Sequence, residues 1–170
     1  MNDRSKKVIL RALIHILLLA VLFVLQGVVF SRLRIFGIAP LILPLGVIGV
    51  GLFEGPSWGG LFGLAAGVLS DSALFGTTVL FTVILTALGM GVGLLSSYLL
   101  SRGFPSFFLC SIAALFLIAF FQMFGLLVYR GESPLALLRV AVLQTSYSLF
   151  FVLPIYYLTR YLGRRALRSE

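Results

Sequence analysis

The feature that most constrains the fold is the near absence of charge through the middle of the chain. Between Arg34 and Arg102 the only charged residues are Glu54 and Asp71. The whole sequence is 61% hydrophobic and 11% charged, whereas a soluble domain carries about 25% charged residues. We therefore expect an integral membrane protein. The composition excludes a disordered chain, a nucleic-acid-binding domain and a soluble enzyme.

The length of 170 residues limits what can lie outside the membrane. A spanning helix needs about 20 residues, so six would use about 120 and leave no room for an extramembrane catalytic domain. We expect one all-α domain over 1–170, a compact bundle of about six transmembrane helices with short basic tails over 1–7 and 162–170. The expected helices cover 8–30, 40–53, 57–70, 77–100, 105–129 and 134–161, the last one bent at Pro154.

The second and third expected helices are too short to cross a core of about 30 Å without help. They form either a re-entrant hairpin or two short crossings packed inside the bundle. A single span through both is disfavoured, because Glu54, Gly55 and Pro56 would lie at its centre. We favour two short crossings.

Basic residues indicate the orientation of the bundle. With six helices, one side collects Arg4, Lys6, Lys7, Arg11, Arg102, Arg160, Arg164, Arg165 and Arg168. The other side collects Arg32, Arg34, Arg130 and Arg139. Because cytoplasmic loops carry the excess of Lys and Arg, both termini are predicted to be cytoplasmic.

Small residues recur every four positions in two of the expected helices. The first row is Gly59, Gly63, Gly67 and Asp71, with Gly76 in the loop that follows; the second is Gly89, Gly93, Ser97 and Ser101. A step of four turns a helix by about 400°, so each row stays on one face and lets another helix approach closely. We expect a helix-packing or partner interface here. The first row meets either a partner helix or the chain's own helix over 77–100.

Asp71, at the end of the first row, has three possible roles. The carboxylate is solvated or caps the next segment through the amides of Ser72 and Ala73. Alternatively it pairs with a buried arginine or a partner chain, or it relays protons. A relay normally uses several acids or histidines in series, and none follow here. We favour the structural role.

Groups able to perform catalysis are scarce. His15 has no Cys, His or Asp at ligand spacing, so we expect no metal site and interpret it as an interfacial or interhelical hydrogen-bonding group. Glu54 is expected in a turn at the membrane interface, and Cys110 as a small buried or lipid-facing side chain. No glycine loop precedes Lys-Ser or Lys-Thr, which excludes ATP hydrolysis by this chain alone. We expect no catalytic residue, no cofactor and no enzyme activity.

Three amide side chains fall in apolar segments: Gln26, Gln122 and Gln144. We interpret them as interhelical hydrogen-bonding groups, worth about 0.6 kcal/mol each. The alternative is a ligand cavity lined by these amides together with Thr82, Thr86, Tyr147 and Ser148.

The first small-residue row resembles the signature of a known family, the rod shape-determining protein MreD family. The residues that carry the resemblance are Gly59, Gly63, Gly67 and Asp71 at four-residue spacing, followed by Gly76 and a Leu-rich helix. Gln26 and Pro40 also match positions typical of the family, whereas Leu41 stands where its members often have a polar residue. The specific part covers 57–80, and the whole chain is similar in length, helix count and charge layout.

The resemblance implies a multi-pass protein of the bacterial inner membrane, similar in fold to the substrate-binding S components of energy-coupling-factor vitamin transporters. It implies a non-enzymatic scaffold or regulator of cell elongation and peptidoglycan synthesis that maintains rod shape. The implied partners are an MreC-like bitopic protein, the RodA–PBP2 synthase and, indirectly, the MreB cytoskeleton. An S component is the alternative function, although the small-residue pattern of Ala12 and Ala20 is interrupted by Ile16. A small channel, transporter or membrane enzyme is the third.

Overall fold

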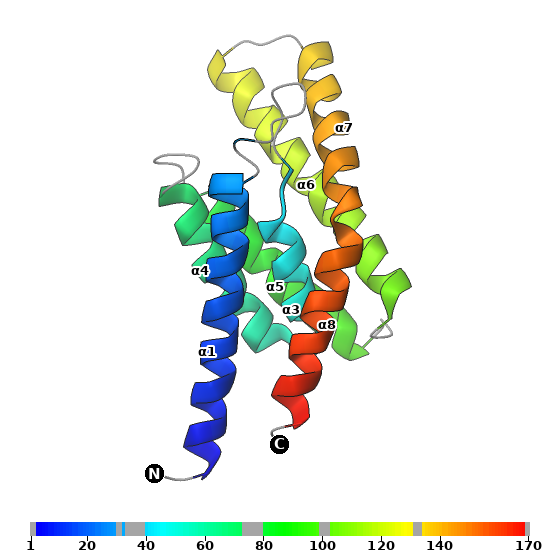
Figure 1. Ribbon diagram of the computed structural model, residues 1–170. Coiled ribbons are helices and arrows are strands. Elements are labelled where there is room, and N and C mark those ends of the chain that lie inside the picture. Colours follow the sequence, from blue (N-terminus) through cyan, green and yellow to red (C-terminus); the bar gives the residue numbers. More distant parts are fainter. Residues whose placement is uncertain are drawn as a thin grey trace.

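The computed structural model describes residues 3–29, 32, 40–72, 80–98, 103–130 and 134–168. The elements within these ranges are helical, as expected (Figure 1). They are α1 (Asp3–Val24), a π-helical turn η1 (Leu25–Val29), α3 (Leu43–Glu54), α4 (Pro56–Ser70), α5 (Leu80–Tyr98), α6 (Phe104–Arg130), α7 (Pro134–Phe150) and α8 (Val152–Arg168). Gly76 lies outside the described residues.

Three of the described helical segments are long and apolar enough to cross a membrane: Val8–Val28, Leu80–Tyr98 and Phe104–Gln122. The bent pair Ala141–Phe150 and Val152–Gly163 gives a fourth if it crosses as one span. The expected membrane character is therefore present in three or four candidate spans, and the six expected spans stay a prediction. The difference comes from α3 and α4, whose 12 and 15 residues reach only about 18 and 22 Å.

The last expected helix is divided into α7 and α8, which meet at an angle of 50°. The break falls at Phe151, about one turn before Pro154. Pro154 has no N–H, and its ring excludes the carbonyl of Phe150 four residues earlier. The amide of Phe151 instead donates to the carbonyl of Ser148, three residues back, at 3.0 Å. The proline therefore acts on the preceding turn rather than at its own position.

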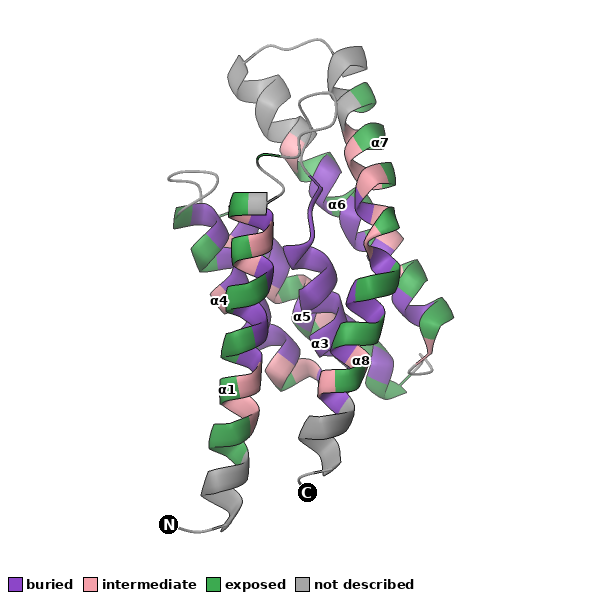
Figure 2. Cartoon of the chain, in the orientation of Figure 1, coloured by how far each residue is buried: buried purple, intermediate pink, exposed green. Residues whose placement is uncertain are grey.

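The central element of the bundle is α3. Every residue from Leu43 to Phe53 is buried, and the helix is apolar around its whole circumference, as expected for a helix enclosed on all sides. Figure 2 shows α3 inside the bundle, whereas α1 and α8 are buried only along their inner faces. The outer face of α1 exposes Ile16, Leu17 and Val21, which suits contact with lipid.

Contacts along α3 fix the direction of its neighbours. The Gln26 end of the first helix meets Leu43, and the Arg11 end meets Glu54, so α1 and α3 are antiparallel. Gly163 of α8 lies against Phe53 of α3. The beginning of α1 and the end of α8 consequently lie at the same end of the molecule (Figure 1), which also contains Glu54.

Candidate functional site

The two glycine rows face one another across α4 and α5. A Cβ atom added at Gly59 would lie 2.5 Å from the carbonyl oxygen of Gly89. Added Cβ atoms at Gly63 and Gly67 would collide with the backbone of Leu85 and Thr82, respectively. The helices are thus in backbone contact along the row. Of the two alternatives left open by the sequence, the structure places the first row on the chain's own helix.

The contact between α4 and α5 also includes α3, a third helix that was not predicted at this contact. A Cβ at Gly51 of α3 would lie 2.7 Å from the Gly89 oxygen, and one at Gly93 would lie 2.5 Å from the Cα of Pro56. Ser96 of α5 donates to the Leu52 carbonyl at 2.9 Å. We refer to the contact formed by Gly51, Gly59, Gly63, Gly67, Gly89 and Gly93 as the glycine seam.

Asp71 is buried at the end of α4 and caps the start of α5. Its Oδ1 accepts a hydrogen bond from the Phe81 amide at 3.2 Å. Its Oδ2 accepts from the Thr82 amide at 2.8 Å and from the Thr82 hydroxyl at 2.7 Å. A carboxylate is favourable at a helix N-terminus, where amide hydrogens lack partners. A capping role was among the expected roles, and the carboxylate reaches the first turn of α5. The expected partner Ala73 lies outside the described residues.

Gln26 and Ser148 hold the start of α3. The Gln26 side-chain oxygen accepts from the amides of Ile42 and Leu43 at 3.0 and 2.8 Å. The Ser148 hydroxyl accepts from the Leu41 amide at 2.9 Å and donates to the Gln144 carbonyl at 2.7 Å. These contacts satisfy amides that the helix cannot pair internally. Gln26 is therefore the interhelical polar group that its position predicted.

The alternative ligand cavity is not assembled from the residues proposed for it. Thr82 binds Asp71, and Thr86 donates to the Thr82 carbonyl within α5. Gln122 and Gln144 are half-buried on α6 and α7. A cavity of about 220 Å³ does open between these two helices, and its lining is almost wholly apolar. It is lined by Phe116, Ala119, Phe120, Leu138, Ala141, Val142, Thr145 and Ser146.

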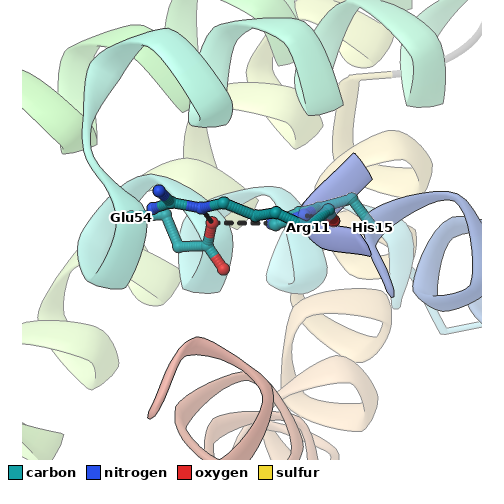
Figure 3. A network of polar contacts seen from close by, with 3 residues as sticks. All are labelled: Arg11, His15 and Glu54. Atoms are coloured by element: carbon teal, nitrogen blue, oxygen red, sulfur yellow. Dashed lines mark hydrogen bonds and ion pairs between the residues drawn. The ribbon is translucent and has the colours of Figure 1, made fainter. Parts of the chain in front are cut away.

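A buried polar cluster joins α1 to the end of α3 (Figure 3). The Nε of Arg11 donates to the Oε2 of Glu54 at 2.9 Å, and the Nε2 of His15 lies 3.0 Å from the same oxygen. The Nδ1 of His15 lies 2.7 Å from the Arg11 carbonyl. The Glu54 side chain is only 3% exposed. Glu54 was expected as an interfacial residue in a turn; it does precede a turn at Gly55, but packing of α1 encloses its carboxylate.

Trp58 of α4 completes this cluster. Its indole stacks on the His15 ring, with centroids 5.0 Å apart and planes 19° apart. The Arg11 guanidinium carbon lies 5.3 Å from the indole centroid. Cations are attracted to the face of an indole ring. The cluster of Arg11, His15, Glu54 and Trp58 therefore connects three helices, and His15 is an interhelical group as expected.

The acidic side chains near the apolar core hold helices together. Both described carboxylates near the apolar core, Glu54 and Asp71, bind partners within the chain. Among the described residues, no group of three or more His, Cys, Asp or Glu side chains is placed to hold a metal ion. Cys110 is half-buried in α6.

One signal in the sequence could have predicted the contact between Arg11 and Glu54: the order and direction of the first two helices. In a bundle whose helices alternate in direction, the start of the first helix and the end of the second lie on the same side, which places Arg11 and Glu54 at the same end of the bundle.

Comparisons of the chain with protein-family models, with curated proteins and with solved structures gave no match.

Proposed function

We propose that this chain is a non-enzymatic membrane scaffold of the bacterial cell-elongation complex, of the kind that the resemblance to the MreD family implies. The proposal includes six membrane passes and cytoplasmic termini in the inner membrane. The antiparallel directions of α1 and α3 support a count of six passes, in which α3 and α4 are short crossings inside the bundle. The positive-inside rule supports the orientation.

The observation that carries the proposal is the structural role of the row Gly59, Gly63, Gly67 and Asp71. The glycines bring α4 into backbone contact with α5, and Asp71 caps α5. The residues that carry the family resemblance thus support a rigid bundle rather than chemistry. The intramembrane acids are engaged in contacts that hold helices together, which suits a protein that acts by binding other proteins.

The proposed partners are an MreC-like bitopic protein, the RodA–PBP2 synthase and, through them, the MreB cytoskeleton. Because the glycine seam is filled by the chain's own helices, a partner would contact outer faces of the bundle. Exposed apolar side chains are present there on several helices, among them Leu61, Val83 and Phe116.

Co-purification from cross-linked host membranes tests this proposal. The tagged chain should retain the MreC-like protein in mild detergent, and an unrelated multi-pass protein with the same tag should not. Absence of the MreC-like protein from both cross-linked and native preparations would contradict the proposal. Retention of a vitamin in native mass spectrometry would instead favour the S-component alternative.

A further inference from the structure

The apolar cavity between α6 and α7 is formed by two helical segments that can lie within a membrane. Phe116 and Phe120 line it from the candidate span Phe104–Gln122. Val142 lines it from Ala141–Phe150, the first half of the bent pair. The cavity therefore lies at the depth of the bilayer, where the surrounding molecules are lipid chains.

The mouth of the cavity faces outward, away from the core of the bundle. The lining includes four exposed large apolar side chains, two on each helix and one turn apart: Phe116, Phe120, Leu138 and Val142. Between them, Ala119 is buried and Ala141 is half-buried. These two small side chains leave the space that the larger ones flank, so the cavity is accessible from the lipid side.

The size and lining of the cavity select a hydrocarbon chain over a helix. Its volume of about 220 Å³ exceeds that of an engineered apolar cavity of about 150 Å³ that binds benzene. An α-helix with its side chains is about 10 Å across and cannot enter such a space. Within the lining, hydroxyl groups come only from Thr145 and Ser146, so a polar ligand would find few hydrogen-bonding partners.

A cation stands at one end of this cavity. With about 100° per residue, Arg139 lies on the same side of α7 as Val142, three residues later. It comes two residues before the segment Ala141–Phe150, and its side chain is exposed. Among the described residues, no carboxylate pairs with it. Because arginine side chains near the ends of spanning segments reach toward the membrane surface, Arg139 is placed to bind an anion there.

We propose that the cavity between α6 and α7 binds one acyl chain of an anionic phospholipid whose phosphate pairs with Arg139. A guanidinium and a phosphate can form two parallel N–H···O bonds. Moving an acyl chain from bilayer hydrocarbon into an apolar cavity gives little driving force, so selectivity for the lipid depends on its charge. The lipid belongs to the leaflet at the end opposite the two chain termini, where α7 begins (Figure 1). The inference stands independently of the proposed function.

Photo-crosslinking locates the acyl chain in the unmodified protein. The intact chain in lipid nanodiscs is given phosphatidylglycerol with a diazirine in one acyl chain, and mass spectrometry of its peptides maps the labelled residues. We expect labelling to concentrate on 116–120 and 138–146. Labelling spread evenly over the exposed faces of the bundle, including that of α1, would overturn the proposal. So would a co-purified protein that crosslinks at the cavity in place of the lipid.

Variants separate the role of the cavity from that of the cation. Ala141→Leu fills the cavity and should abolish the concentrated labelling. Ala20→Leu adds the same atoms at an exposed position of α1 and should leave the labelling unchanged. Undiminished labelling in Ala141→Leu would contradict the proposal.

Native mass spectrometry in equal mixtures of phosphatidylglycerol and phosphatidylcholine measures the preference for the anionic lipid. Arg139→Gln should reduce this preference about tenfold, as expected for the loss of one hydrogen bond to a charged group. Arg139→Lys keeps the charge and should retain most of the preference. Equal retention of the two lipids by the unmodified chain would overturn the assignment of Arg139 as the phosphate-binding group.

Discussion

Gly63 of α4 lies so close to the Leu85 carbonyl of α5 that no side chain fits between the two helices. The whole seam shares this geometry, since the nearest atom to a Cβ added at each of its glycines is a backbone atom. Backbone cannot move aside as a side-chain end can, so the seam has little tolerance for added atoms.

Gly63→Ala should therefore destabilise the monomer. We expect a loss of about 1–3 kcal/mol, the usual cost of overpacking, measured by unfolding in mixed detergent micelles. Gly91→Ala is the matched control, because a Cβ at Gly91 of α5 would have nothing within 4 Å. Equal stability of the two variants, with assembly lost only in Gly63→Ala, would show that the seam receives a partner helix instead.

Asp71→Ala should weaken the start of α5, because three hydrogen bonds to Phe81 and Thr82 lose their acceptor. We expect a cost of about 1–2 kcal/mol in unfolding free energy, as for other N-caps. Asp71→Asn keeps one acceptor oxygen and should cost less. The exposed neighbour Ser72 provides the control Ser72→Ala. If Asp71→Asn abolished function with unchanged stability, the charge would have a role beyond capping.

Gln26→Leu should release the start of α3. The variant leaves the buried amides of Ile42 and Leu43 without their acceptor, at about 1–3 kcal/mol for each unsatisfied group. Hydrogen exchange should accelerate at these two amides. Gln122→Leu, on α6, removes an amide elsewhere in the bundle and should leave exchange at Ile42 unchanged. Protected amides in Gln26→Leu would contradict the anchoring role.

Local signals predicted most helix boundaries well. Pro56 and Pro134 each occupy a first helical position, where their missing N–H costs nothing. The four-residue glycine spacing predicted close packing, which the seam displays. Pro154 was placed correctly as the origin of a bend, but the break lies earlier, at Phe151, because a proline disturbs the carbonyl four residues before it.

Contacts between distant segments could not be read from the sequence in the same way. The cap on α5 comes from Asp71, before the intervening loop, and not from the residues adjacent to α5. Gly51 continues the four-residue spacing of the first row through Gly55, but it belongs to α3, on the other side of the helix break between Glu54 and Pro56. A spacing rule for a single helix therefore does not place it in the seam. The proximity of Arg11 and Glu54 depends on antiparallel packing of α1 and α3, which local composition does not encode.

The most direct test of the proposed scaffold function is the shape of host cells after depletion of this chain. Our account predicts that rod-shaped cells widen and round up, and that expression of the wild-type chain from a plasmid restores their length-to-width ratio. The measurement is that ratio, taken by microscopy across several generations of depletion. Depleted cells that grow as normal rods would contradict the central claim.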